Sequence, residues 1–255
     1  MALFFDGPIS DAADLQRYEN AILNVASAES IDIGDKIQIA QYDLANEIRL
    51  FLVRRSSPGD YLCGFPQSRD LKDVVVTGPM RQWHVHRTLS LIYRDAYNNQ
   101  LNNRYQGKWA EYEQLAKASE RTYFQIGVGL VADPVPQAAV PVLSSVAGTA
   151  AGGMFYVAVT WVNGSGDEGA PSEIAQMSTS DGQQLVVTVG APPQNVTTWN
   201  AYAGTSPTTL NLQNPSPLGT NSSWTMTSGL NAGAAPSSGQ RPTWFIVDHR
   251  VIERG

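Results

Sequence analysis

The sequence predicts an α+β fold with two domains, an N-terminal four-helix bundle followed by an antiparallel β-sandwich. The apolar residues follow a helical period in the first half and alternate with a period of two in the second half. Charge also falls sharply, since residues 1–133 contain 14 Lys and Arg and 17 Asp and Glu, whereas residues 134–255 contain 3 and 6. We therefore expect a helical domain, a linker, a sandwich, and a flexible linker ending in an arm or a last strand, with the bounds 1–133, 134–145, 146–230 and 231–255.

The first helix is expected near residues 10–28. Ser10 is a good N-cap, and the carboxylates of Asp11 and Asp14 suit the positive end of a helix dipole. One apolar face then keeps helical spacing through Leu15, Tyr18, Ile22 and Val25.

The second helix is expected near residues 33–55, with Asp32 as its N-cap. Arg54 and Arg55 fall in its last turn, where cations suit the dipole. Its apolar stripe consists of Ile33, Ile37, Ala40, Leu44, Ile48 and Phe51. The following segment, 56–78, is predicted to be a loop in which DVVVT forms a short strand or an extended lead-in.

The stretch from Pro79 to Val131 is rich in aromatic residues and predicts two further helices. The first carries an apolar face of Val85, Leu89, Ile92, Tyr93, Ala96 and Tyr97, and the second one of Trp109, Tyr112, Leu115, Ala116, Ser119 and Tyr123. These faces do not join smoothly, because the twelve residues from Tyr97 to Trp109 make about 3.3 turns. Asn and Gly, both weak helix formers, fill the bridge. We expect a break between Asn102 and Gly107.

The second half predicts roughly seven short strands. The segment MFYVAVTW alternates strictly, and EIAQMS, QLVVTVGA, TTWNAYAGT, TLNLQ and SSWTMTS follow it between Pro, Gly and Asn residues. This spacing is typical of an antiparallel sandwich, with Trp161, Trp199 and Tyr202 as expected core aromatics. The final segment, RPTWFIVDHRVIERG, is expected to be either the last strand of the sandwich or an arm that docks on another protein.

Composition excludes several classes of protein. The formal net charge of -6 argues against a duplex-DNA binder, which normally has a basic surface. Cys63 is the only cysteine, so no intrachain disulfide is expected. The first ten residues lack the basic region of a signal peptide, and no apolar run approaches the ~20 residues that span a membrane. We expect a soluble protein made in the cytoplasm, with no membrane partner.

We expect no catalytic, cofactor-binding or metal site. His84 and His86 lie two residues apart on a predicted helix, so they point in different directions and are expected to pack at the surface or at an interface. The Gly127-Val128-Gly129 run lacks the third glycine of a dinucleotide fingerprint. Asp167 and Glu168 are read as a solvated turn in preference to a cation site. The Ser, His and Asp residues form no nucleophile elbow.

Arg and aromatic residues alternate along the two helices of Pro79–Val131. The possible roles are a packed helix with a solvated face, a subunit interface, or nucleic-acid binding, and nearby acidic residues argue against the last. We take as candidate interface residues Trp83, Arg87, Arg94, Tyr97, Arg104, Tyr105, Trp109, Trp244, Phe245 and Ile246.

The helical part resembles the head–tail connector (adaptor, neck) proteins of tailed bacteriophages. The resemblance covers about residues 1–135 and rests on a set of motifs: RLFLVRR, the run from VVVTGPMRQW through YRDAYNNQLNNRYQGKW, and FQIGVGLVADP. The second part, with NGSGDEGAPSE and WNAYAGTSP, resembles the immunoglobulin-like or fibronectin-like modules attached to phage structural proteins. Such an added module departs from the shorter helical connectors.

The resemblance implies a virion structural protein at the head–tail junction, assembled in the host cytoplasm. It implies a ring, commonly of twelve copies, that docks under the portal protein, contacts a downstream neck or tail protein, and lines the channel through which the genome DNA passes without specific binding. A head-to-tail contact between copies closes into such a ring, and an acidic lumen repels DNA phosphate.

Two other hypotheses belong to different classes. In one, the sandwich binds glycans or a host surface and the helices only oligomerise it, which exposed aromatics near Trp199 or Trp224 would favour. In the other the chain is an enzyme, which the lack of a catalytic motif disfavours.

Overall fold

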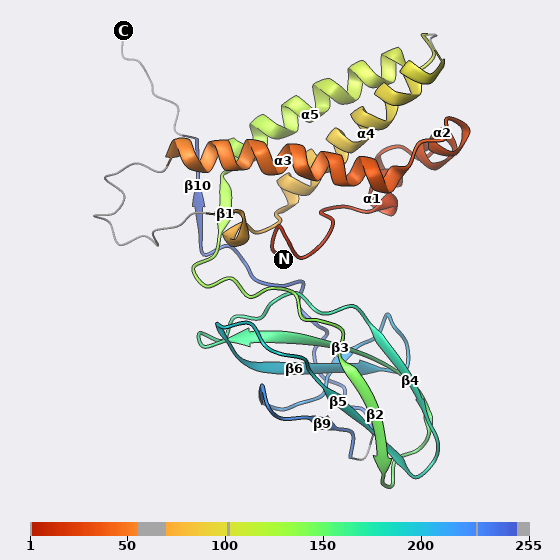
Figure 1. Ribbon diagram of the computed structural model, residues 1–255, viewed down its shortest axis with the longest axis vertical. Coiled ribbons are helices and arrows are strands. Elements are labelled where there is room, and N and C mark those ends of the chain that lie inside the picture. Colours follow the sequence, from red (N-terminus) through yellow and green to blue (C-terminus); the bar gives the residue numbers. More distant parts are fainter. Residues whose placement is uncertain (1, 56–69, 101–102, 228, 249–255) are drawn as a thin grey trace. The chain divides into compact units, whose positions relative to one another are not determined.

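The computed structural model describes residues 2–55, 70–100, 103–227 and 229–248. Its internal contacts divide the chain into two compact units (Figure 1). The helical unit comprises Gly7–Ala132 and Pro242–Gly255, and the β unit comprises Met1–Asp6 and Asp133–Arg241. Helices and antiparallel sheets are both present, which confirms the mixed α+β class.

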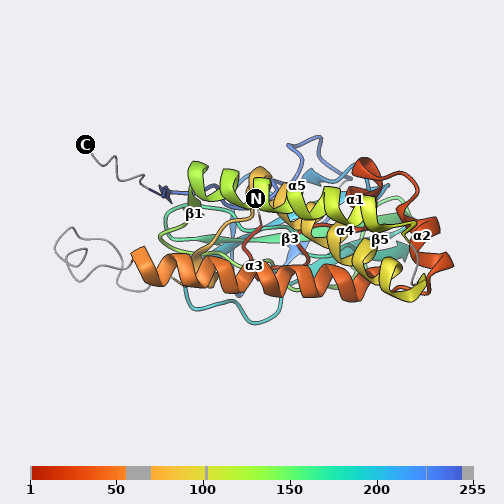
Figure 2. The same ribbon diagram turned by 90° about the horizontal axis from the view of Figure 1, so that it is seen from above.

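Five α-helices, one 3₁₀ helix and two short strands form the described part of the helical unit. They are α1 (Ala12–Tyr18), α2 (Ile22–Ala28), α3 (Ile33–Arg55), η2 (Leu71–Asp73), α4 (Gly78–Gln100), α5 (Gln106–Ile126), β1 (Val128–Leu130) and β10 (Trp244–Ile246). Helix α4 is central, because it packs against both α3 and α5 (Figure 2).

The prediction of one continuous helix over residues 10–28 is wrong, because α1 ends at Tyr18 and α2 begins at Ile22. Glu19 adopts an extended conformation there, and its carboxylate accepts a hydrogen bond from the Tyr112 hydroxyl at 3.1 Å. The predicted Ser10 cap is wrong as well. Asp11 caps α1 in a reciprocal capping box with Asp14, whose amide donates to the Asp11 carboxylate at 2.8 Å.

The predictions for α3 and for the break after α4 are confirmed. Helix α3 spans Ile33–Arg55, and the Asp35 amide donates to the Asp32 carboxylate at 3.2 Å. Helix α5 begins at Gln106, after a turn that includes Tyr105. The change of direction allows the α4 and α5 faces to meet in one core of Leu15, Ile22, Ile37, Val85, Leu89, Ile92, Tyr93, Ala96, Tyr105 and Tyr112.

Strand β10 pairs with β1 in the helical unit, with Val128 opposite Ile246 and Leu130 opposite Trp244. The Thr243 amide also donates to the Leu130 carbonyl at 2.7 Å. The expectation that this segment is the last strand of the sandwich is therefore wrong, whereas residues 249–255 of the expected docking arm lie outside the described part of the chain. Close approach explains the Gly at position 129, since a Cβ there would lie 2.8 Å from a ring carbon of Pro242.

Because β1 pairs with β10, the domain organisation differs from the expected linear order of a helical domain followed by a β domain. The chain leaves the helical unit after β1 and returns to it at β10, so the β unit is an insertion between two paired strands. The extended segment DVVVT supports β1 from the other edge, because the Val75 amide donates to the Gly129 carbonyl at 3.0 Å. Such adjacent entry and exit points are typical of tolerated domain insertions.

The first six residues belong to the β unit rather than to the expected helical domain of residues 1–133. Leu3 and Phe4 are buried. The Asp6 carboxylate accepts hydrogen bonds from the Gln137 amide at 2.8 Å and from the Leu3 amide at 2.6 Å. The helical unit therefore begins at Gly7.

Two antiparallel sheets make up the described part of the β unit. One has the order β2-β5-β9, and the other has the order β4-β3-β6-β7, with β8 paired to β6. The strands are β2 (Val142–Ala147), β3 (Gly153–Asn163), β4 (Ala175–Thr179), β5 (Gln183–Thr188), β6 (Val196–Gly204), β7 (Asn211–Leu212), β8 (Leu218–Gly219) and β9 (Trp224–Thr225).

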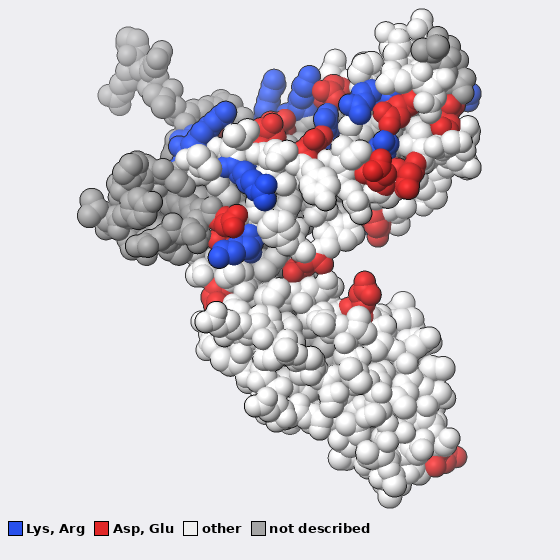
Figure 3. Space-filling model, in the orientation of Figure 1, with Lys and Arg blue, Asp and Glu red and all other residues white. Residues whose placement is uncertain are grey.

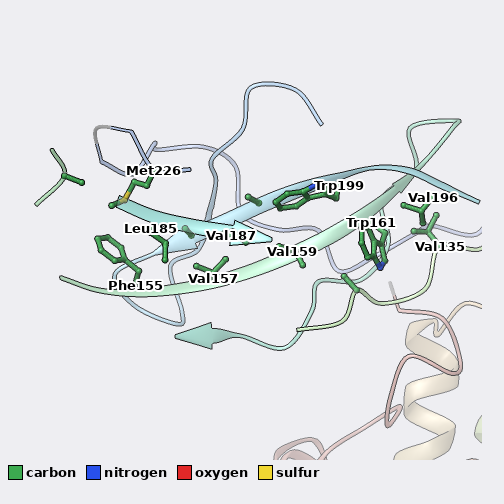
Figure 4. Close-up of a cluster of buried hydrophobic side chains, with 14 residues drawn as sticks. Val135, Phe155, Val157, Val159, Trp161, Leu185, Val187, Val196, Trp199 and Met226 are labelled. Carbon is green, nitrogen blue, oxygen red and sulfur yellow. The ribbon is translucent and has the colours of Figure 1, made fainter. Parts of the chain in front are cut away.

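Both sheets contribute side chains to one hydrophobic core (Figure 4). Val157, Val159 and Trp161 come from β3, while Leu185 and Val187 come from β5. Trp199 is fully buried, and its indole N–H donates to the Gly219 carbonyl at 3.1 Å. Trp161 is also in this core, which confirms two of the three expected core aromatics, whereas Tyr202 is buried in a separate cluster with Ala158 and Leu210.

Charge is concentrated on the helical unit. Figure 3 shows Lys, Arg, Asp and Glu side chains interspersed over that unit, whereas the same face of the β unit is nearly free of them. The sequence contains no Lys or Arg between Arg121 and Arg241. No helix in the described part of the chain is long and apolar enough to cross a membrane.

Candidate interaction surfaces

Two of the predicted interface aromatics are used inside the helical unit. Trp83 is 3% exposed, and its ring lies 5.6 Å from the rings of Tyr123 and Phe124. Tyr105 is also buried, and its hydroxyl donates to the Glu29 carboxylate at 3.0 Å. Both side chains therefore support the fold of the single chain.

Tyr97 and Trp109 stack across the break between α4 and α5. Their ring centroids lie 5.7 Å apart at an interplanar angle of 27°, and both side chains are half-buried. Such a pair adds about 0.5–1.5 kcal/mol to the burial of its apolar area. The stack holds the two helices against each other across the break.

The three predicted interface arginines all have partners within the chain. Arg87 binds Asp43 at 2.7 Å and Glu113 at 3.4 Å, which links α4 to both α3 and α5. Arg94 lies 3.5 Å from the carboxylate of Asp95. The Arg104 guanidinium sits over the ring of Tyr105, 5.1 Å from its centroid.

The predicted interface aromatics of the C-terminal segment lie on β10. Phe245 is 49% exposed, whereas Trp244 and Ile246 are half-buried. Because alternate residues of a strand point to opposite faces, Phe245 projects away from the side shared by its neighbours. Of the three, only Phe245 therefore offers a large apolar surface to another molecule.

An acidic groove of about 300 Å³ lies between α3 and α5, over α4. We use the name acidic groove for the surface formed by Asp43, Leu44, Asn46, Glu47, Trp83, Arg87, Glu113, Ala116, Lys117 and Glu120. Trp83 and Ala116 give it an apolar floor. Arg87 and Lys117 are its only cations against four carboxylates, so its formal charge is negative.

The four carboxylates differ in their surroundings. Asp43 and Glu113 are paired with Arg87, and Lys117 binds Glu113 at 3.3 Å. Burial disfavours the charged form of Glu113, but hydrogen bonds from Ser90 and Lys117 outweigh it and lower the pKa of this carboxyl.

Glu120, in contrast to Glu113, has a raised pKa. Burial first, and then the nearby Glu47 carboxylate, raise the pKa of Glu120 above its usual value. Neither Glu47 nor Glu120 forms an ion pair of 4 Å or less with a described cation. These two glutamates therefore hold the surplus negative charge of the acidic groove.

Helix α3 also carries a second apolar face, which we name the α3 stripe: Ile39, Tyr42, Leu50 and Val53. Tyr42, Leu50 and Val53 are 69%, 48% and 72% exposed. With 3.6 residues per turn, these positions fall on the side of α3 opposite its buried residues, such as Leu44. The sequence interpretation missed this face because it assigned a single stripe to the helix, although these four apolar residues lie outside that stripe.

The histidines have structural roles. His84 is fully buried: the Ser10 hydroxyl lies 2.7 Å from its Nδ1, and the Ile37 carbonyl lies 3.0 Å from its Nε2. His86 is also buried and lies 2.8 Å from the Ser119 hydroxyl. Their expected position at the surface or an interface is therefore wrong. Among the described residues, no group of three or more His, Cys, Asp or Glu side chains is placed to hold a metal ion.

Glu168 is not part of a simple solvated turn. One oxygen of its half-buried carboxylate accepts hydrogen bonds from Tyr202 at 2.7 Å, from Asn200 at 2.9 Å and from Thr160. Burial first, and then the hydrogen bond to Glu168, raise the pKa of Tyr202. The carboxylate joins its loop to β3 and β6, and no local sequence pattern signals that role.

The tryptophans of the β unit do not form an exposed aromatic platform. Trp199 is fully buried, and Trp224 is half-buried and packs against the same core. Comparisons of the chain with models of protein families, with curated proteins and with solved structures found no match. The functional argument therefore rests on the residues and surfaces described above.

Proposed function

We propose that the chain is a non-enzymatic virion structural protein, a head–tail connector that forms a ring under the portal protein and lines the DNA channel. The observation that carries this proposal is the second apolar face of α3. A surface helix of a self-sufficient monomer needs one buried face, and exposed apolar positions that recur along a helix mark a contact site. The motifs of residues 1–135 that resemble connector proteins supply the particular role.

The finer architecture belongs to the same proposal. We interpret the helical unit as a connector-type helical bundle centred on α4. We interpret the β unit as an immunoglobulin-like or fibronectin-like sandwich, because two antiparallel sheets share one core. Since the β unit is inserted between β1 and β10, it decorates the ring without interrupting α3, α4 or α5.

Charge supports passage of DNA without binding. The formal net charge of the chain is -6, so a ring of twelve copies carries a large acidic excess. A negative lumen repels phosphate and gives DNA no sites at which to stop. The portal protein, neighbouring copies and a downstream neck or tail protein are the proposed partners.

A glycan-binding or host-surface-binding role is the alternative. Exposed aromatics near Trp199 or Trp224 are the feature expected to favour it, but Trp199 belongs to the core and the half-buried Trp224 packs against it. The described β unit thus lacks, at these two positions, the aromatic platform on which sugar rings stack.

Binding of the purified protein to isolated portal rings tests the connector role. We expect co-sedimentation with portal rings and a ring of additional density on one end of each portal in electron micrographs. A glycan array run in parallel tests the alternative. Specific glycan binding together with no binding to portal rings would reverse the preference.

A further inference from the structure

We propose that the α3 stripe of one copy docks against the acidic groove of the next copy. This inference rests on the proposed homo-oligomeric assembly and names the two surfaces that meet in it. The α3 stripe consists of exposed and half-buried residues, and the acidic groove has charged walls over a floor of buried residues such as Trp83. Because they are different surfaces on one chain, their contact is head-to-tail, and its repetition produces a ring when the rotation closes.

Charge favours a second copy as the occupant of the acidic groove. Glu47 and Glu120 hold its surplus negative charge, as shown above. The α3 stripe is flanked by Arg49 and Arg54, which are both exposed and form no ion pair with a described residue. Docking places a guanidinium beside two mutually repelling carboxylates, which satisfies both sides of the contact.

Shape and polarity agree with the charges. The acidic groove has charged walls on α3 and α5 and an apolar floor that includes Trp83. The α3 stripe presents the reverse arrangement, with Leu50 and Val53 between two cations. An apolar ridge with a basic rim thus fits an apolar floor with an acidic rim, which is the usual anatomy of a specific protein interface.

The groove and the stripe occupy adjoining sectors of α3. Asp43 and Glu47 face the groove, whereas the α3 stripe is opposite the buried face, and Asn46 of the groove lies one turn from both Tyr42 and Leu50. One helix therefore borders both contacts. A contact between two identical stripes, by contrast, stops at a dimer.

Two double variants test this pairing. The groove variant, Glu47→Lys with Glu120→Lys, keeps the stripe, and the stripe variant, Leu50→Glu with Val53→Glu, keeps the groove. Asn24→Lys with Ser27→Lys is the matched control, because it adds two cations at exposed positions of α2. Circular dichroism melting of each protein verifies that it is folded.

Sedimentation velocity over a concentration series is the measurement. We expect the wild type and the control to self-associate equally, and each test variant to associate at least about tenfold more weakly. An equimolar mixture of the two test variants is expected to form a heterodimer and nothing larger, because only one intact stripe and one intact groove remain to meet.

Four results would overturn the proposal. The wild type stays monomeric at every concentration, or the groove variant associates as well as the wild type. The mixture fails to pair while the groove variant alone still dimerises, which indicates a contact between stripes. The stripe variant melts at a lower temperature without a change in association, which indicates that the stripe stabilises the single chain and is not a contact between copies.

The same data separate this contact from the connector role. Oligomers that persist in both double variants overturn the contact and leave the connector role standing. A chain whose variants pair as expected, yet which does not bind portal rings, retains the contact and loses the connector role.

Discussion

Replacement of His84 by Gln is expected to remove a large part of the acid sensitivity of the helical unit. The buried imidazole of His84, on α4, connects two other parts of the chain. The hydroxyl of Ser10, which precedes α1, lies 2.7 Å from Nδ1, and the carbonyl of Ile37, on α3, lies 3.0 Å from Nε2. A carbonyl oxygen only accepts, so Nε2 carries the proton and Nδ1 accepts from Ser10. The neutral ring satisfies both partners.

The magnitude follows from the pKa. Burial lowers the pKa of His84 from 6.5 to about 4, and the charge of Arg81 acts in the same direction. At 1.36 kcal/mol per pKa unit, this difference corresponds to about 3 kcal/mol of unfolding free energy. The unfolded chain binds the proton below pH 6.5 and the folded chain only near pH 4. Stability is therefore fully present above about pH 6.5 and falls as the pH approaches 4.

Urea unfolding at pH 7, 6, 5 and 4 measures the effect in both proteins. Glutamine retains one donor and one acceptor but does not titrate, and the carboxylates and His86 contribute equally to both proteins. The free-energy difference between wild type and His84→Gln is therefore expected to shift by about 3 kcal/mol in favour of the variant between pH 7 and pH 4. A difference that stays constant over this range would refute the reasoning.

Three further predictions follow from other contacts. Glu168→Ala is expected to destabilise the β unit by about 2–4 kcal/mol, because it leaves the Tyr202 hydroxyl and two other donors without an acceptor. Glu168→Gln retains an acceptor and is expected to lose less stability, and thermal melts of both variants measure the difference. Trp109→Ala is expected to lower the unfolding free energy by about 1–3 kcal/mol without unfolding the chain, which urea titration measures, and a fully unfolded variant contradicts it. Deleting the segment between Val131 and Pro242 and joining these two residues through an Asn-Gly turn is expected to leave a folded helical protein, because β1 and β10 already pair. Loss of the helical circular dichroism signal would contradict the interpretation of the β unit as an insertion.

The sequence predictions that the structure confirms depend on residues close to one another in the sequence. The Asp32 cap and the bounds of α3 depend on neighbouring residues, and the break after α4 depends on the phase shift between Tyr97 and Trp109. The core position of Trp199 follows from strand alternation. Each signal lies within a few turns of helix or within one strand.

The features that sequence reasoning missed depend on distant residues. Strand β10 pairs with β1 across more than a hundred residues, and nothing near Trp244 indicates which edge it joins. The Ser10 hydroxyl forms a hydrogen bond with His84 and does not cap α1, because the Asp11 carboxylate accepts from the first-turn amide of Asp14. Glu168 gains its role only when β3 and β6 are paired.

The prediction of the candidate interface was limited in the same way, because burial of a side chain depends on residues distant in the sequence. Seven of the ten candidate interface residues lie in Pro79–Val131, where Arg and aromatic residues alternate. The structure uses Trp83 and Tyr105 in the core and pairs Arg87 with two carboxylates. The more exposed apolar face lies on α3, at Tyr42, Leu50 and Val53. A count of apolar residues outside the buried stripe of each helix is the signal that finds it.

Electron cryomicroscopy of particles that contain this protein tests the central claim most directly. The connector role predicts a ring of copies beneath the portal, with α3, α4 and α5 of the helical unit fitting the density of each subunit and the β units projecting from the ring. Complete particles in which the chain is absent from the head–tail junction, or lies elsewhere on the capsid or the tail, would contradict it.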